Sequence, residues 1–396
     1  MIKSNITYQL SNYISNLEYD KLSNEQIDNL KYKILDWFGC AIGANSKPIG
    51  KKISKLFNNV VDKKGASSIV GLREKVHFSN AAYANGMLGH VLELDDVHKS
   101  SISHPGAIAV PSAMAIAQVF NSSIEDFLMG VVAGYEVMIR LGTALNPSHY
   151  EYWHTTGTCG TFASAAASSR VRRYSAIETN NTLNIASTTS SGLVSVFGTD
   201  AKLVTVGHAC FAGTMASMFT EVGLTAPNNI LGVKNGYVEA TSKDKKIYDI
   251  LNNNGHNLMV DTAFYKIHAS CGHTHSSIDG VLSLLTEENI DISKITKIDI
   301  GTYDKAIELT GRFMNESEQK AKFSLPYCIA CAIIYGKVSL SEFCHEILNS
   351  PKIKELSDKV HVFSDNECNK YYPEKRMAKV KIYTKEKVFE KTVPLP

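Results

Sequence analysis

Long runs of small residues constrain the fold of this chain more than any other feature. They recur along the first two-thirds of the sequence, as AIAVPSAMAIAQVF at 107–120, FLMGVVAGYEVMIRLGTAL at 127–145 and TFASAAASSRV at 161–171. Ala, Gly and Ser leave room for neighbouring helix backbones to approach closely. We therefore expect a tightly packed helical bundle, buried within a large domain or at a dimer interface.

The end of the chain has a different character. Partial strand alternation occurs at Ile295–Ile300 and Val360–Val362, and Ala378–Val388 suggests a hairpin that turns at 384–387. Two helices are expected between these strands, near 276–288 and 321–335. The predicted fold is mainly α, with a large all-helical domain at 1–262 followed by a smaller α+β domain at 263–396.

Helix signals near the start of the chain agree with this division. Ser23-Asn24-Glu25-Gln26 has the sequence of a capping box, in which the Ser and Gln side chains bind each other's backbone N–H groups. Apolar residues then recur at helical spacing from Ile27 to Ala41. The first long helix is therefore expected to begin at Asn24.

Composition excludes several classes of partner. The 396 residues carry a net charge of +2, which gives no reason to expect nucleic acid or a membrane surface as partner. No uninterrupted apolar run reaches the roughly 18 residues of a spanning helix. Eight cysteines are scattered, and the C-x-x-C at Cys328 and Cys331 lies in an apolar, helical-looking run that favours buried thiols. We expect a cytoplasmic protein.

Ionisable residues are concentrated in the segment NGMLGHVLELDDVHKSSISHPGAIAVP at 85–111. It contains His90, Glu93, Asp95, Asp96, His98 and His104. Such groups are costly to bury unless they are paired or used, so the segment indicates a functional site. Imidazole and carboxylate also suit divalent metals, but the spacing matches no zinc signature, and a magnesium–diphosphate site would need a second acidic set. For single residues, the structural alternatives are a helix cap for Asp95 and a hydrogen-bonded core histidine for His90.

Four more segments contain candidate residues. His154 precedes a Thr/Gly turn into a small-residue helix, where backbone N–H groups favour an anion. Lys202 precedes a second such helix. Lys266–Asp279 contains Cys271 and three histidines, and Ser324-Leu-Pro-Tyr327 places a tyrosine on a helix. The structural alternatives are a capped helix entry for His154, a solvated surface lysine for Lys202 and a core aromatic for Tyr327.

The pattern N-G-x(3)-H-x-L-[E/D]-x-D-D followed by H-P resembles the MmgE/PrpD family, which includes 2-methylcitrate dehydratase, cis-aconitate decarboxylase and iminodisuccinate epimerase. The resemblance covers nearly the whole chain and implies an all-helical domain, an α/β lid and a homodimer. Members of the family usually continue past the lid hairpin with a helical segment that returns to the first domain. We expect that segment to be absent from this chain, which stops at Val393-Pro-Leu-Pro396.

The resemblance also implies roles for individual residues. It gives His104, His154, Lys202, Tyr327 and Glu93 catalytic roles. Substrate binding is expected from Asp95, Asp96, Lys266, Cys271, His273 and His275. The chain departs from the family at several of these positions. Glu93 is one methylene longer than the usual Asp, Val97 replaces a frequent Thr, Cys271 replaces the His of decarboxylase-like members, and Gly272 replaces a frequent Arg.

Cofactor motifs are missing from the sequence: it has no GxGxxG after a strand, no Walker loop and no nucleophile elbow. No cofactor and no metal are therefore predicted. Cationic and acidic residues together suit a small polycarboxylate. The resemblance implies that a proton beside a carboxylate is removed or added, for which His154 or His104 would be the base. We predict a dehydratase acting on a citrate-like acid. The alternatives are an epimerase of an iminodisuccinate-like dicarboxylate, a cis-aconitate-type decarboxylase, or a degenerate, non-enzymatic dimeric binding protein.

Overall fold

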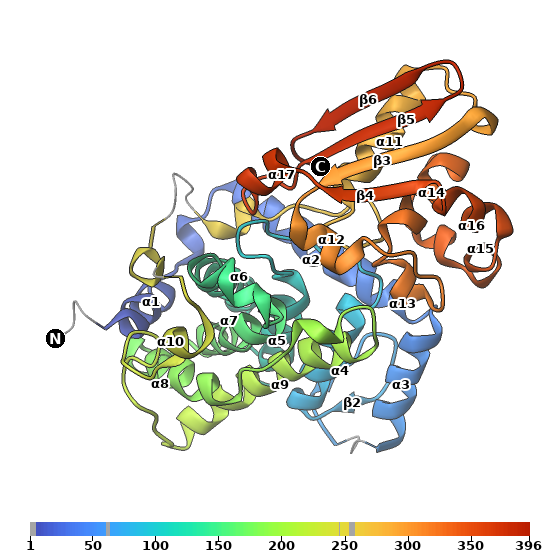
Figure 1. Ribbon diagram of the computed structural model, residues 1–396. Helices are drawn as coiled ribbons and strands as arrows, with labels where there is room; N and C mark the ends of the chain where they lie inside the picture. Colours follow the sequence, from blue (N-terminus) through green and yellow to red (C-terminus); the bar gives the residue numbers. More distant parts are fainter. Residues whose placement is uncertain (1–4, 61–63, 245, 253–257) are drawn as a thin grey trace. The chain divides into compact units, whose positions relative to one another are not determined.

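A computed structural model of the chain describes residues 5–60, 64–244, 246–252 and 258–396 (Figure 1). The chain forms two compact units. The first comprises residues 1–196 and 201–265, and the second comprises residues 197–200 and 266–396. The main division follows Tyr265, three residues beyond the expected boundary, and the short segment 197–200 groups with the second unit. The fold is mainly α, as predicted.

The first unit is built from helices, with one short β-ladder between β1 (Ser67–Ser68) and β2 (Lys75–Val76). Its α-helices are α1 (Ile6–Ser15), α2 (Asn24–Ala44), α3 (Pro48–Val60), α4 (Phe78–His90), α5 (Gly106–Phe120), α6 (Ile124–Leu145), α7 (Thr155–Val171), α8 (Ala176–Ala186), α9 (Ala201–Glu221) and α10 (Tyr237–Thr241). The predicted capping box is present: Ser23 Oγ accepts from the N–H of Gln26, whose side chain accepts from the N–H of Ser23.

Small residues bring the central helices into close contact. Helix α7 packs against both α6 and α9, and α9 also packs against α4. A Cβ atom added at Gly213 of α9 would lie 2.4 Å from Ser164 Cβ of α7, and one at Gly207 would lie 2.7 Å from the carbonyl oxygen of Tyr83 in α4. The packing therefore requires glycine at these positions, which is the close helix approach predicted from the sequence.

Two helices of the first unit, α6 and α9, are long and apolar enough to pass a length-and-hydropathy test for membrane spans. In α6, 94% of the apolar window is buried inside the unit, and in α9 the share is 56%. The core helix of a soluble protein passes the same test, so the absence of a membrane partner stays a prediction.

The second unit contains a four-stranded sheet in the order β4-β3-β5-β6. Strand β3 (Ile295–Thr302) pairs in parallel with β4 (Val360–Ser364) and antiparallel with β5 (Ala378–Thr384), and β5 pairs antiparallel with β6 (Val388–Val393). The register places Ile298 opposite Val360 on one side and Ile382 on the other. The predicted hairpin turn is closed by the N–H of Thr384, which donates to the Lys387 carbonyl over 2.9 Å.

Helices accompany this sheet. They are α11 (His275–Glu287), α12 (Asp304–Thr310), α13 (Glu318–Ala321), α14 (Leu325–Tyr335), α15 (His345–Leu348), α16 (Pro351–Ser357) and α17 (Asn366–Tyr371). The single helix expected at 321–335 is divided, because Ser324 leaves the helical conformation and caps α14 by accepting from the N–H of Tyr327. A cap within an apolar run is easily overlooked, since Ser is also tolerated inside helices.

Candidate active site

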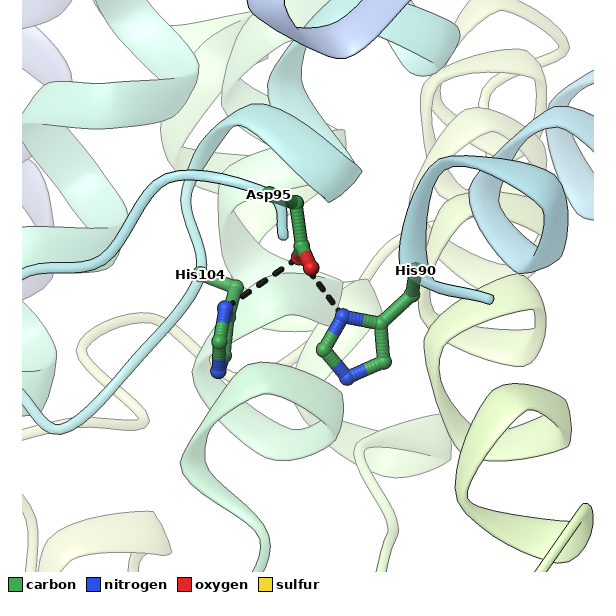
Figure 2. Close-up of side chains that lie close together, drawn as sticks. All are labelled: His90, Asp95 and His104. Atoms are coloured by element: carbon green, nitrogen blue, oxygen red, sulfur yellow. Dashed lines mark hydrogen bonds and ion pairs between the residues drawn. The ribbon is translucent and has the colours of Figure 1, made fainter. Parts of the chain in front are cut away.

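Two histidines of the first unit share one buried carboxylate (Figure 2). His90 lies at the last position of α4, and Asp95 and His104 lie on the chain between α4 and α5. Asp95 Oδ2 lies 2.6 Å from His90 Nδ1 and 3.2 Å from His104 Nδ1. Burial acts to raise the pKa of Asp95, but the two histidines outweigh it and hold the pKa well below its ordinary value. Asp95 is therefore ionised and can only accept hydrogen bonds.

The same three residues could also be considered as metal ligands. In the described part of the chain, they are the group whose possible ligand atoms come close together, all within 4.8 Å of one another. Two ligands of one tetrahedral ion, each about 2.1 Å from it, lie about 3.4 Å apart. The 2.6 Å between His90 Nδ1 and Asp95 Oδ2 is a hydrogen-bond distance and too short for two such ligands. The arrangement fits a shared carboxylate better than a metal centre, and the metal-free site stays a prediction.

Asp96 serves the fold rather than the histidines. Its Oδ1 accepts from the N–H of Gly106 at the start of α5 over 2.9 Å, and its Oδ2 accepts from the Tyr135 hydroxyl over 2.7 Å. A carboxylate at a helix N-terminus is favoured by the free N–H groups there. The helix-capping role considered for Asp95 therefore belongs to Asp96. Because both oxygens of Asp96 are hydrogen-bonded within the protein, its predicted contact with substrate has no support from the geometry.

Glu93 and Lys202 form a buried ion pair. Lys202 lies in the first turn of α9, where the helix dipole disfavours a cation, and its side chain is only 6% exposed. The carboxylate of Glu93 compensates for this position. Glu93 has φ of +54°, in the left-handed region that side chains other than glycine rarely adopt, so its backbone is strained where it presents the carboxylate. The solvated surface lysine considered for position 202 is thus not what the structure has.

His154 is the N-cap residue of α7 and is buried. Its Nδ1 lies 2.8 Å from Thr205 Oγ1, one turn after Lys202 on α9. Burial, followed by the positive charge of Lys202, lowers the pKa of His154 well below its ordinary value. The ring is therefore neutral at neutral pH, and its distance of 6.2 Å from the His90 ring places it in the same cluster.

Together these side chains provide the parts of an acid–base site. A neutral imidazole can accept a proton, and a histidine held by a carboxylate can accept or donate one. A buried ammonium can stabilise negative charge that develops on a substrate. The first unit thus brings together Glu93, Asp95, His104, His154 and Lys202, which lie on three separate segments of the sequence.

Position 97, where the family often has Thr, has a structural role here. Val97 is buried, and its N–H and carbonyl exchange 2.9 Å hydrogen bonds with the carbonyl and N–H of Phe264. His98 also turns to local partners, with its Nδ1 2.9 Å from Ser101 Oγ. Neither side chain is part of the cluster described above.

The predicted residues of the second unit are buried. Lys266, Cys271, His273 and His275 are each less than a tenth exposed. His273 Nδ1 lies 2.6 Å from the Tyr303 hydroxyl, and His275 Nε2 lies 3.3 Å from the Ser270 carbonyl. Burial, then Lys266 and His268, lowers the pKa of His275 well below its ordinary value. Their substrate-binding roles stay predictions.

The hydroxyl group of Tyr327 is held by a backbone carbonyl. Its side chain is fully buried, and its hydroxyl donates to the Glu342 carbonyl over 2.6 Å. Burial, then nearby thiols, raises the pKa of Tyr327 far above its ordinary value. The core aromatic considered at this position describes its surroundings better than the catalytic role that the resemblance implied, and that role stays untested.

Gly272 faces an arginine that the sequence did not indicate. A Cβ atom added at Gly272 would lie 2.8 Å from Arg376 Nη1. The arginine that the family often has at this position is missing from the sequence, but a guanidinium group from elsewhere in the second unit occupies the adjacent space. Arg376 is itself buried.

Three further residues near the cluster were missed. Thr205 could have been found, because it lies one helical turn after Lys202 on the same face. Tyr135 and Asp36 gave no signal, since each meets Asp96 only through the packing of helices distant in sequence. Asp36, on α2, accepts from the backbone N–H of Asp96, and burial, then Asp96 and Asp95, raises its pKa to about 7.

Comparison with known proteins identifies the family of this chain and several relatives. The family model described as the MmgE/PrpD N-terminal domain matches residues 8–249, and the MmgE/PrpD C-terminal domain matches residues 268–396. The chain is 22% identical to a cis-aconitate decarboxylase-like protein, oryM, of Aspergillus oryzae, over 93% of this chain and 81% of that protein. It is 24% identical to cis-aconitate decarboxylase of Aspergillus terreus (90% and 78% covered) and 25% identical to that of Homo sapiens (91% and 77% covered).

Proposed function

Because this chain belongs to the MmgE/PrpD family, we propose that it is a cofactor-independent lyase acting on a small, citrate-like polycarboxylate. The central step is the transfer of a proton at a carbon atom beside a carboxylate. The observation that carries the proposal is the buried cluster of the first unit, in which neutral His154 lies near the Glu93–Lys202 ion pair. The cytoplasmic location and the homodimer belong to the same proposal.

The roles follow from the charges of the cluster. His154 is neutral and can act as the base, and His104 is the second candidate because Asp95 stabilises its protonated form. Protons beside a carboxylate are weakly acidic, so negative charge that develops on the substrate must be stabilised. Lys202, already dehydrated by burial, is placed to do this once the substrate competes with Glu93 for its ammonium.

Two reactions of this class are each favoured by a different observation: loss of CO₂, after which a proton is added to carbon, and loss of water, for which a proton is removed from carbon. The related proteins are named cis-aconitate decarboxylases, which favours the loss of CO₂. Cys271, at the position where decarboxylase-like members have histidine, favours the loss of water, as in a dehydratase. The first reaction to test is decarboxylation of cis-aconitate, and the second is dehydration of citrate or 2-methylcitrate.

Proton NMR in D₂O distinguishes these possibilities. The purified chain is incubated with cis-aconitate, citrate, 2-methylcitrate and iminodisuccinate, and the product signals are followed with time. A lost carboxyl group identifies a decarboxylase, a new alkene identifies a dehydratase, and deuterium at an inverted centre identifies an epimerase. A folded protein that gives no exchange with any of the four acids contradicts the proposal.

A binding protein without activity gives a different result. It would melt at a higher temperature with a millimolar tricarboxylate such as propane-1,2,3-tricarboxylate but would incorporate no deuterium into any acid. A Lys202→Met variant serves as the control for both measurements, because it removes the ammonium group that the proposal assigns to the substrate.

A further inference from the structure

His90 lies between the two acidic residues of the cluster and is fully buried. Its Nδ1 lies 2.6 Å from Asp95 Oδ2, and its Nε2 lies 3.8 Å from Glu93 Oε1. Its ring meets the His104 ring edge to face at 4.7 Å and stacks with the His154 ring at 6.2 Å. His90 thus contacts both candidate bases and both carboxylates, although a core histidine would have satisfied the sequence pattern.

Asp95 is shared unequally between its two histidines. The His90 contact is 0.6 Å shorter than the 3.2 Å contact of His104, and both are made to the same oxygen, Oδ2. An ionised carboxylate can only accept hydrogen bonds. The Nδ1 of His90 therefore carries a hydrogen atom and donates a hydrogen bond to Asp95. A strong donor on an oxygen draws negative charge away from a second group bound to that oxygen. The charge that His104 receives therefore depends on His90.

We propose that His90 is a positioning residue that sets how much of the negative charge of Asp95 reaches His104. The consequence of this role for catalysis rests on the proposed function, in which His104 is a candidate base. The contacts among His90, Asp95 and His104 do not depend on that function. With His90 in place, Asp95 Oδ2 lies 3.2 Å from the Nδ1 of His104 and favours the tautomer in which Nε2 is the proton-accepting atom. Without the His90 donor, the full charge of Asp95 acts on His104, which then holds a proton more tightly.

Other charged groups around His90 are the same in every variant considered below. Glu93 faces its Nε2, His154 of α7 stacks on its ring, Lys202 of α9 is paired with Glu93, and Asp36 and Lys33 of α2 lie behind Asp96. A substitution of His90 alone therefore changes the hydrogen bonding of the Asp95 carboxylate without removing another charge from the first unit.

Two substitutions separate the two nitrogen atoms of His90. In His90→Asn the amide nitrogen is attached to Cγ, as Nδ1 is in histidine, so the donor to Asp95 is kept. In His90→Gln the amide is one carbon further along, near the position of Nε2, and the donor to Asp95 is lost. Asp95→Asn, which removes the shared charge itself, is the third variant.

The readout is the titration of His104, followed by ¹H–¹⁵N NMR of the histidine side chains and assigned with a His104→Gln variant. His90→Gln is expected to move the midpoint upward by about one pH unit, because the Asp95 carboxylate then interacts with His104 alone. Asp95→Asn is expected to move it downward, because the negative charge is removed. His90→Asn is expected to leave it where it is in the wild type. Melting temperatures confirm that each variant is folded.

Equal midpoints in His90→Gln and wild type, or equal shifts in His90→Gln and His90→Asn, would overturn the inference. In the active enzyme the acid limb of the pH–rate profile should move with the His104 midpoint, while a merely structural role would lower kcat equally at every pH. A shifted His104 titration in a protein that turns over none of the acids would uphold the inference and refute the proposed function, so the two failures are distinguishable.

Discussion

The ammonium group of Lys202 is paired with the carboxylate of Glu93, in the interior of the first unit and across more than a hundred residues of sequence. Removing one partner leaves the other charged, buried and uncompensated. We expect Glu93→Gln to lower the activity by on the order of 10²–10³ and the free energy of unfolding by about 3–5 kcal/mol. Activity assays and chemical unfolding measure the two effects.

A matched control for this prediction is the exposed ion pair between Lys243 and Glu151, at 3.1 Å. Solvent screens such a pair, so Glu151→Gln is expected to change neither activity nor stability measurably. Full activity in Glu93→Gln would show that the buried pair has no part in the chemistry.

His154 should be needed for activity, whereas His149 should not, although both are buried histidines five residues apart. Burial lowers the pKa of His149 to about 4, and its two nitrogens lie 2.7 Å from Thr158 Oγ1 and 3.0 Å from the Thr241 carbonyl, away from the cluster. We expect His154→Asn to reduce deuterium exchange by on the order of 10²–10⁴ and His149→Asn to reduce only the melting temperature. Equal exchange rates in the two variants would exclude His154 as the base.

Asp36 should make stability depend on pH. Its carboxyl has a pKa of about 7 in the folded protein against an ordinary 3.8, so the folded state favours the protonated form. The contribution of Asp36 to the free energy of unfolding therefore falls as the pH rises from about 4 to 7, and it is lost above about pH 7. Asp36→Asn keeps an acceptor for the Asp96 N–H without the charge. It should be more stable than the wild type at pH 8, by on the order of 3 kcal/mol, and similar to it at pH 4. Melting curves at the two pH values test this, and an equal difference at both would contradict it.

Chelators should leave the activity unchanged. The short contact between His90 Nδ1 and Asp95 Oδ2 fits a shared proton and is too close for two ligands of one ion. Dialysis against EDTA, followed by the D₂O exchange assay with and without added Zn²⁺ or Mg²⁺, measures the dependence. Activity that is lost on dialysis and restored by one metal would make the three residues a metal site instead.

Packing of the small-residue helices should be intolerant of a single methyl group. A Cβ atom at Gly213 would lie 2.4 Å from Ser164 Cβ and 2.6 Å from the backbone nitrogen of Ala165, so Gly213→Ala forces α7 and α9 apart. We expect a loss of about 1–3 kcal/mol in the free energy of unfolding. Gly39 of α2 is the matched control: outside its chain neighbours and the adjacent backbone of its own helix, no atom lies within 4 Å of its added Cβ, so Gly39→Ala should stabilise the helix by about 0.5–1 kcal/mol.

Local signals were sufficient for much of the fold. The capping box at Ser23, the hairpin around Thr384–Lys387 and the strand at Ile295 were predictable because each depends on residues adjacent in sequence. The split between α13 and α14 was not, because the cap by Ser324 lies within a continuous apolar run.

The candidate site was predictable as a set of residues but not as a set of contacts. A dense group of ionisable residues between apolar segments identified Glu93, Asp95 and His104. Which of two consecutive aspartates faces the histidines depends on where α5 begins and where Tyr135 of α6 lies, and neither is encoded locally. The same holds for Tyr327, whose hydroxyl partner is a backbone carbonyl fifteen residues away.

The small side chains of α5 and α7 have a consequence beyond close packing. Alanine and glycine have no side-chain rotamers to lose when the chain folds, so the many small residues lower the side-chain entropy that these two helices lose on ordering. His154 is the N-cap residue of α7, and His104 lies two residues before the start of α5, so each backbone is held next to an ordered helix. With the backbone held in this way, the contacts of His104 with Asp95 and of His154 with Thr205 preorganise the two rings, so that a ligand spends less binding energy on ordering them.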